Sequence, residues 1–197
     1  MRISRTEFPG VLVLEPKVFQ DNRGFFLESF NRSVFEQHGL PVDFVQDNHA
    51  YSRGVGVLRG FHFQGPPAAQ GKLVWVTRGA VVDVIVDIRN GSPTYGKWGQ
   101  LRLTAHNFLR LYIPAGFAHA YMTLSEHTEF MYKVDAPYAP ETEGGIRWND
   151  PDLAVNWPAV WDRDEPVLSE KDRNLPLLSE LDSPFVYQPG SKEGLLI

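Results

Sequence analysis

The sequence contains no cysteine. Disulfide-stapled folds, cysteine-ligated zinc, iron–sulfur clusters and thiol nucleophiles are therefore excluded. The first residues form no apolar signal core, and no apolar run approaches the roughly 20 residues needed to cross a bilayer. These absences predict a cytoplasmic protein with no membrane partner.

Runs of like charge are also missing. The 197 residues carry 19 Lys and Arg against 24 Asp and Glu, a formal net charge of −5. Because proteins that bind duplex nucleic acid usually present a basic face, nucleic acid is not an expected partner. A few local arginines can still hold a phosphate whatever the net charge.

Short apolar segments separated by Gly, Pro, Asn and Asp make up most of the chain, and long amphipathic helices are absent from the pattern. Many short strands with short turns are typical of an all-β sandwich or barrel. A single domain over residues 1–197 is expected, with an irregular tail from about residue 165 wrapping around it. The segments predicted as strands are residues 11–14, 25–30, 56–63, 73–77, 80–89, 100–104, 109–113, 120–124 and 129–134.

Two local features refine this prediction. Residues 33–38 are the best helix candidate, with Ser33 as its N-cap and Gly39 as its stop. Arg78 and Gly79 separate two predicted strands and indicate a hairpin turn.

Two aspartates lie in the most apolar of the predicted strands, residues 80–89. Period-2 alternation places Asp83 and Asp87 on the same face. An unpaired buried carboxylate is costly, so both need partners. An ion pair with Lys72 or with an arginine across the hairpin would satisfy them, and an electrostatic clamp in the mouth of a barrel is the functional alternative.

Three further side chains carry a structural and a functional interpretation each, and a fourth belongs to a motif. Tyr132 shares the inward face of its strand with apolar residues, so it is either a structural tyrosine or an acid that gives a proton to a carbanion. Arg23 and Arg59 each adjoin a glycine, and are either turn and strand arginines or phosphate ligands. His119 ends a segment that resembles the Pro-x-Gly-x-x-His motif of cupins.

The other half of a metal-binding cupin motif is incomplete. Metal cupins have a His-x-His pair followed by Glu, whereas residues 61–64 offer only His62. A catalytic metal normally needs about three protein ligands. A cupin-like barrel without a metal is therefore expected.

Ten segments of the chain are motifs that can be compared with known families. They are Asp21–Glu28, Phe44–His49, Gly56–Gln64, Gln70–Val74, Val82–Arg89, Ser92–Gly96, Ile113–His119, Glu129–Lys133, Gly145–Pro151 and Leu168–Asp172. Taken together, these motifs resemble the dTDP-4-dehydrorhamnose 3,5-epimerase family. The match runs in order from about residue 7 to residue 176, whereas the tail from about residue 177 is not matched. No single motif is decisive, but the ordered set is highly specific.

The resemblance implies a cupin-type jelly-roll β-sandwich with a few short helices, forming a homodimer that exchanges N-terminal strands. It also implies a substrate, a dTDP-linked 4-keto-6-deoxy-hexose. Inverting C3 and C5 of dTDP-4-dehydro-6-deoxy-D-glucose yields dTDP-4-dehydro-L-rhamnose on the way to dTDP-L-rhamnose. No cofactor is implied, in keeping with the lack of a Gly-rich dinucleotide fingerprint.

The resemblance also assigns roles to residues. His62 and Asp172 are the base, Tyr132 is the opposed acid, and Lys72 lies near the developing enolate. The binding residues it implies are Arg23 and Arg59 at the diphosphate, Glu28, Gln46 and Asn48 beside the nucleotide, and Asp83, His119 and Tyr138 in the pocket. The chemistry is consistent, since a C–H next to a ketone is acidified through the enolate and inversion needs a base and an acid on opposite faces.

Three departures from the family pattern, Phe61, Trp75 and Ala120, affect the shape of the expected pocket. A relative that epimerises only C3 or only C5 is one alternative, against which Tyr132 argues because an acid on the far face completes the inversion. A metal-dependent cupin enzyme using His62, His119 and His49 is a second alternative. A non-catalytic sugar- or nucleotide-binding cupin is a third.

Overall fold

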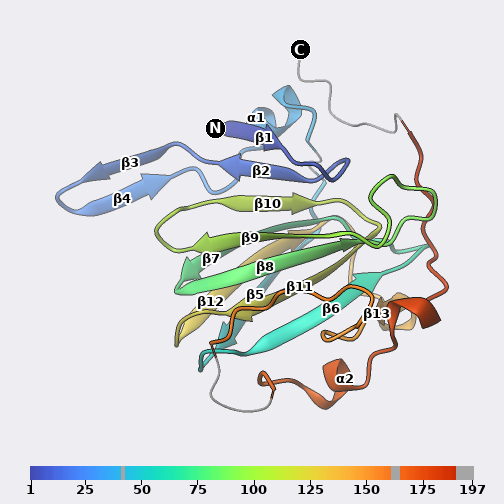
Figure 1. Ribbon diagram of the computed structural model, residues 1–197. Helices are drawn as coiled ribbons and strands as arrows, with labels where there is room; N and C mark the ends of the chain where they lie inside the picture. The colour runs from blue at the N-terminus through green and yellow to red at the C-terminus, as the bar shows by residue number, and fades with distance from the viewer. Residues whose placement is uncertain (41–42, 161–164, 190–197) are drawn as a thin grey trace.

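Two antiparallel sheets face each other in the computed structural model, which describes residues 1–40, 43–160 and 165–189 (Figure 1). The predicted all-β sandwich with a few short helices is confirmed. The six-stranded sheet has the order β1 (Arg2–Arg5), β2 (Leu12–Glu15), β10 (Arg110–Ile113), β7 (Lys72–Arg78), β12 (Thr128–Val134) and β5 (Gln46–Ser52). The five-stranded sheet has the order β13 (Glu143–Gly145), β6 (Leu58–Gln64), β11 (Phe117–Thr123), β8 (Ala80–Asp87) and β9 (Trp98–Thr104).

The remaining elements are short. Strands β3 (Val18–Asp21) and β4 (Gly24–Leu27) form a separate hairpin that projects from the sandwich (Figure 1). Helix α1 spans Arg32–Gln37 and helix α2 spans Glu170–Arg173, and two 3₁₀ turns cover Pro140–Thr142 and Leu178–Glu180. Within the described residues, none of the helices has the length and apolar character required to cross a bilayer.

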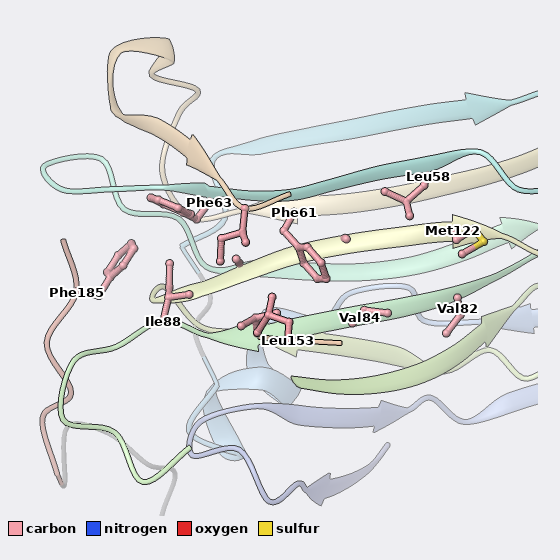
Figure 2. Packing of buried hydrophobic residues seen from close by; sticks show 13 residues of the cluster. Leu58, Phe61, Phe63, Val82, Val84, Ile88, Met122, Leu153 and Phe185 are labelled. Carbon is pink, nitrogen blue, oxygen red and sulfur yellow. The ribbon is translucent and has the colours of Figure 1, made fainter. Parts of the chain in front are cut away.

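Alternation along β8 divides the core into layers. Val81 and Ile85 point into the space between the two sheets, where they pack with β7, β10 and β12. Val82, Val84 and Val86 point to the outer face of the five-stranded sheet, which segments from the C-terminal part of the chain cover, among them Leu153 and Phe185 (Figure 2). Because both faces of β8 are covered, its residues are buried without exception.

The outer face of the six-stranded sheet is covered by α1. Phe35 of α1 packs with Leu14 of β2, Leu73 of β7 and Tyr112 of β10. The helix begins one residue earlier than predicted, because the side chain of Asn31 accepts a hydrogen bond from the Val34 amide and is the N-cap in place of Ser33.

The hairpin predicted at Arg78 and Gly79 is wrong. Strand β7 pairs with β10 and β12 in one sheet, whereas β8 pairs with β9 and β11 in the other. The turn is therefore a corner that carries the chain from sheet to sheet. Gly79 permits it with a φ of +80° and with no Cβ, which would lie 2.5 Å from the Thr128 hydroxyl.

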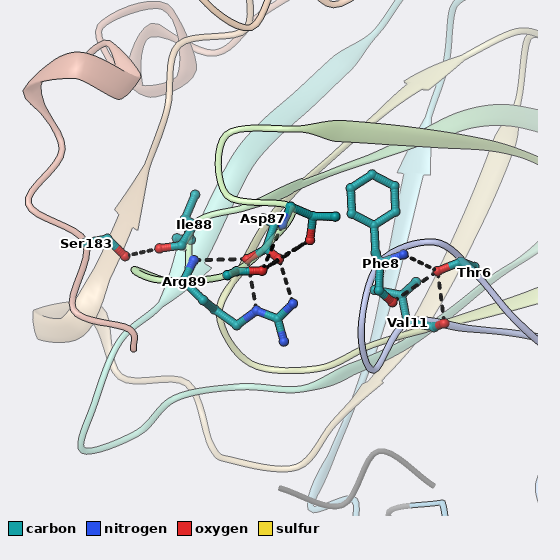
Figure 3. Close-up of polar contacts among 9 residues, drawn as sticks. Thr6, Phe8, Val11, Asp87, Ile88, Arg89 and Ser183 are labelled. Carbon is teal, nitrogen blue, oxygen red and sulfur yellow. Dashed lines mark hydrogen bonds and ion pairs between the residues drawn. The ribbon is translucent and has the colours of Figure 1, made fainter. Parts of the chain in front are cut away.

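Asp87 satisfies its buried carboxylate locally. It accepts hydrogen bonds from Arg89, two residues further along, and from the hydroxyls of Ser92 and Thr94 (Figure 3). Burial raises the pKa of Asp87, but these hydrogen bonds outweigh it and hold the pKa below its ordinary value. The partner of Asp87 is thus an arginine, as the ion-pair interpretation allowed, but this arginine lies in the loop after β8 and not across a hairpin.

The C-terminal tail packs along the sandwich. The Ser183 hydroxyl donates a hydrogen bond to the carbonyl of Ile88 (Figure 3). The backbone of Asn90 forms hydrogen bonds with the backbones of Phe185 and Tyr187. Further upstream, Val167 forms a parallel bridge with Val57. The tail is therefore attached at both ends of the segment that contains α2.

Candidate active site

A pocket of about 480 Å³ lies between the two sheets. Strands β6 and β11 of one sheet line it, and strands β7, β12 and β5 of the other sheet face them. The tail closes one side through α2. The lining residues are Ala50, Val57, Leu58, Arg59, His62, Lys72, His119, Tyr121, Phe130, Tyr132, Val167, Leu168, Ser169, Lys171 and Asp172.

His62 of β6 and Asp172 of α2 form a hydrogen-bonded pair. His62 Nε2 lies 2.6 Å from Asp172 Oδ1, and the carboxylate is nearly buried whereas the imidazole is 29% exposed. Burial raises the pKa of Asp172, but hydrogen bonds from His62 and Ser169 keep it below its ordinary value. The ionised carboxylate only accepts, so Nε2 carries the hydrogen and Nδ1 keeps a lone pair, as a base requires.

Ser169 fixes the start of the helix that positions the Asp172 carboxylate. Its hydroxyl accepts a hydrogen bond from the Asp172 amide at 3.1 Å and is the N-cap of α2. The four-residue helix thereby presents Asp172 toward β6, although the two partners are 110 positions apart in the chain.

A second histidine–aspartate pair lies beside the first. His119 of β11 is the cross-strand neighbour of His62, and His119 Nε2 lies 2.8 Å from Asp83 Oδ2. Burial raises the pKa of Asp83, and the nearby His119 and Lys72 reduce this rise without cancelling it. The partner that Asp83 needs is therefore His119, which lines the pocket whereas Asp83 does not, and Lys72 contributes its charge.

Lys72 begins β7 and is enclosed between the sheets. Its ammonium contacts the His62 carbonyl at 3.4 Å. Burial lowers the pKa of Lys72 to about 8, and the negative charges of Asp83 and Glu143 oppose that fall. An amine with this pKa is still mainly protonated at neutral pH, so it offers a poorly hydrated positive charge to a developing oxyanion.

Tyr132 reaches the pocket from the opposite sheet. Alternation along β12 places it on the inward side with Phe130, as the sequence predicted. Burial raises the pKa of Tyr132, with Arg59 opposing the rise, so the hydroxyl is protonated at neutral pH. The histidine pair and the tyrosine therefore project from facing sheets into one pocket.

An irregularity in β6 brings Arg59 to the pocket. Residues three apart on a regular strand face opposite sides, yet Arg59 and His62 both line the cavity. The register against β11 shifts between His119 and Tyr121, so that Gly60 and Phe61 oppose Ala120 alone, which is a β-bulge. Gly60 has a φ of +121°, and a Cβ there would lie 2.5 Å from the His119 carbonyl oxygen.

Arg23 and Glu28 are not brought to this pocket within one chain. Arg23 lies on the β3–β4 hairpin, where it pairs with Asp21 at 2.6 Å and is almost fully exposed. Glu28 follows the hairpin and accepts a hydrogen bond from Asn31. Neither residue lines the cavity of the same chain.

Three other predicted binding residues, Gln46, Asn48 and Tyr138, are connected to one another beside Tyr132 and are not among the residues that line the pocket. Asn48 on β5 is the cross-strand neighbour of Tyr132, and Gln46 donates to Asn48 at 2.8 Å. The Tyr138 amide donates to Gln46, and its hydroxyl donates to Glu143 at 2.9 Å. These contacts form a polar cluster that reaches Tyr132 through its cross-strand neighbour Asn48.

Sequence reasoning missed Tyr121, Ser169, Lys171 and Glu143. Tyr121 had a signal, because alternation from His119 places it on the same inward face. Ser169 and Lys171 lie within the recognised Leu168–Asp172 motif, but the tail that holds them has no periodicity from which to orient its side chains. Glu143 pairs with Lys171 in the structure through a contact that only the tertiary fold creates.

Among the described residues, no group of three or more His, Asp or Glu side chains is arranged to hold a metal ion. The pocket instead contains two histidine–carboxylate pairs beside a lysine. The fold and these side chains define a jelly-roll protein whose pocket is equipped for proton transfer.

Comparison with known proteins places the chain within that class. A family model described as dTDP-4-dehydrorhamnose 3,5-epimerase matches residues 5–180. The dTDP-4-dehydrorhamnose 3,5-epimerase of Pseudomonas aeruginosa is 51% identical over 183 residues, covering 92% of this chain and 98% of the relative. The chain belongs to the dTDP-4-dehydrorhamnose 3,5-epimerase family.

Two crystal structures of relatives confirm the cupin-type jelly-roll fold. The Legionella pneumophila dTDP-6-deoxy-D-glucose-3,5-epimerase in complex with dTDP-4-keto-L-rhamnose has a TM-score of 0.88 at 43% identity, covering 95% of this chain and 98% of that chain. The Bacillus anthracis dTDP-4-dehydrorhamnose 3,5-epimerase with TDP and PPi bound has a TM-score of 0.85 at 48% identity, covering 89% of this chain and 98% of that chain.

Proposed function

We propose that the protein inverts C3 and C5 of dTDP-4-dehydro-6-deoxy-D-glucose to give dTDP-4-dehydro-L-rhamnose, a step in dTDP-L-rhamnose biosynthesis. Its family is that of the 3,5-epimerases. The observation that carries the proposal is the placement of the His62–Asp172 pair and Tyr132 on opposite sides of one pocket, with Lys72 enclosed between the sheets.

In the proposed mechanism, His62 Nδ1 removes the proton from a carbon next to the C4 ketone. The electron pair of the broken C–H bond moves into the ring, and the negative charge accumulates on the C4 oxygen as an enolate. The Lys72 ammonium stabilises that oxygen, and the Tyr132 hydroxyl returns a proton to the opposite face of the carbon. Asp172 holds the imidazole in the required tautomer and stabilises its charged form.

This chemistry requires no cofactor, because the ketone of the substrate itself accepts the electron pair. Water exclusion strengthens the interaction between Lys72 and the enolate, since charges interact more strongly in a dry site than in bulk water. His119 and Asp83 are assigned to substrate binding beside the reacting carbons, and Gln46, Asn48 and Tyr138 to substrate binding from the polar cluster beside Tyr132.

The proposed reaction is tested by following dTDP-4-keto-6-deoxyglucose by NMR in deuterated water. Deuterium entering at both C3 and C5, with a coupled reductase yielding dTDP-L-rhamnose, is the expected result. Deuterium at one carbon only would establish a single epimerase instead. If neither carbon exchanges, the proposed activity is wrong.

The pH profile provides a further prediction, which concerns Lys72. Because its pKa is lowered to about 8, the charged form dominates below pH 8 and is lost above it. We expect kcat/KM to fall about tenfold per pH unit above pH 8. The pKa of Tyr132 is raised above its ordinary value of 10.0, so this residue does not titrate in the same range.

Lys72→Arg is the variant that tests the assignment of this pH limb. Its guanidinium stays charged beyond pH 12 or so, so any residual activity should no longer decline between pH 8 and 10. A wild-type profile that stays level to pH 9.5 would contradict a role for the Lys72 charge.

A homodimer completes the proposed site. Phe19, Phe25 and Phe26 on the β3–β4 hairpin are 51%, 60% and 66% exposed, a large apolar surface for one short element. The open edge of β5 lies beside the pocket and can receive such an element. The hairpin of one chain then brings Arg23 and Glu28 to the partner's diphosphate and nucleotide site, where Arg59 lies.

Complementation between two inactive variants tests this exchange. Arg23→Ala and His62→Ala chains, co-expressed with different tags and purified as the mixed dimer, should recover about half of the wild-type activity per dimer. If the hairpin acts on the partner, one pocket of the mixed dimer has both defects and the other has none. Activity no higher than that of either variant alone would place Arg23 at its own chain's pocket, and a monomeric mass of 22.3 kDa in solution would contradict the dimer.

A further inference from the structure

The hydroxyl of Tyr121 is an unexplained polar group in the pocket. Tyr121 lines the cavity on β11 and is 5% exposed. Its Oη has no hydrogen-bond partner among the residues that the structure describes. Buried polar groups in native proteins are nearly always hydrogen-bonded, so an unpartnered hydroxyl at a ligand site indicates that the ligand is the partner.

The packing of Tyr121 accounts for its ring and not for its hydroxyl. The ring stacks on Phe130 with centroids 4.0 Å apart and an interplanar angle of 14°. A phenylalanine would make the same stacking contact and bury no polar atom. Because a buried donor without a partner destabilises the folded protein, the hydroxyl has no structural benefit in the free chain.

The neighbours of Tyr121 indicate which part of a substrate it meets. Arg59 is its cross-strand neighbour on β6, next to the bulge. Burial raises the pKa of Tyr121 to about 12, and Arg59 opposes that rise more than any other neighbour. The Ser52 side chain also lowers this pKa, but no hydrogen bond of ordinary geometry joins Ser52 to the Tyr121 hydroxyl. The hydroxyl is therefore a protonated donor next to the cation assigned to the diphosphate.

We propose that Tyr121 Oη donates a hydrogen bond to a diphosphate oxygen of the bound sugar nucleotide, beside the Arg59 guanidinium. This inference rests on the proposed function, since it adds a binding residue to the same site. The anion offers the acceptor that the free pocket lacks, and the aromatic stack holds the donor in place. Tyr121 is thus a substrate-binding residue that does not take part in proton transfer.

Tyr121→Phe tests the inference without disturbing the stack. We expect its dissociation constant for dTDP, measured by calorimetry, to rise about tenfold, because a hydrogen bond to a charged group is lost. KM for the sugar nucleotide should rise in parallel while kcat changes little, since the hydroxyl binds the ground state and the transition state alike. The matched control is Tyr112→Phe on β10, which packs in the outer cluster beneath α1 and should leave dTDP affinity unchanged.

The melting temperature of the free protein separates a ligand-binding role from a structural one. Removing a hydroxyl that has no partner should leave this temperature unchanged or raise it, whereas removing one that stabilises the fold should lower it. Unchanged dTDP affinity in Tyr121→Phe would overturn the inference. If the melting temperature fell at the same time, the hydroxyl would have a structural role instead. Wild-type protein that fails to bind dTDP would instead refute the proposed function itself.

Discussion

His62→Ala is expected to lower both the turnover of dTDP-4-keto-6-deoxyglucose and its deuterium exchange at C3 and C5 by at least about 10³-fold. The physical reason is that general-base catalysis by a positioned side chain contributes about 10²–10⁴-fold. Of the two carboxylate-paired histidines of the pocket, His62 is the more exposed to a ligand, at 29% against 8% for His119. NMR in deuterated water measures exchange, and the coupled reductase measures turnover.

Nucleotide binding should survive this substitution. The imidazole contacts Asp172 and is not among the groups assigned to the diphosphate, so the dissociation constant for dTDP should change less than about threefold. His62→Asn, which keeps a polar amide but has no basic nitrogen, should be as inactive as His62→Ala. Exchange at the wild-type rate in either variant would remove His62 as the base.

A matched control for this residue is His106→Ala. His106 is exposed in the turn after β9 and does not line the pocket. The His106→Ala variant should retain full activity. A loss seen only in the His62 variants would then show that the position in the pocket matters, and not the removal of a histidine as such. The Asp172→Asn variant should fall between the two, because the base would remain but its tautomer would no longer be held.

Tyr132→Phe is expected to have the second largest effect, an approximately 10²-fold loss of inverted product. Proton abstraction by His62 remains possible, because the base lies on the opposite sheet. The imidazolium exchanges its hydrogen for deuterium with the solvent, and the carbanion then takes a deuteron from it on the face that lost the proton. Deuterium should therefore enter the substrate at C3 and C5 with much of the original configuration retained.

The diagnostic quantity is the ratio of exchange to inversion, which NMR of the recovered sugar nucleotide provides. This ratio should rise strongly in Tyr132→Phe and stay at the wild-type value in the control Tyr95→Phe, which lies outside the pocket. Equal losses of exchange and inversion in Tyr132→Phe would contradict the role of the hydroxyl as the acid that only protonates the face opposite His62.

Most strands could be predicted from the sequence, because alternation and turn residues are local signals. Strands β8 and β12 match their predicted ranges within two residues at each end. Strands β1, β3, β5 and β13 were not predicted, since they are short or polar and are strands only because a neighbour pairs with them. The corner at Gly79 was misread because a glycine turn looks the same whether the next strand pairs back or crosses to another sheet.

The sequence by itself determined the family and the β-rich class, and it supplied the candidate side chains for the proposed proton transfer, since each depends on residue types in a fixed order. Alternation also predicted the inward side of Tyr132 correctly.

Only the tertiary structure decided how those side chains meet. The bulge at Gly60 places Arg59 on the same side as His62, against simple alternation. The Ser169 cap on α2 brings Asp172 to a histidine 110 positions earlier in the chain. The projecting hairpin keeps Arg23 away from its own pocket. Each of these depends on contacts between distant segments, which residue periodicity does not encode.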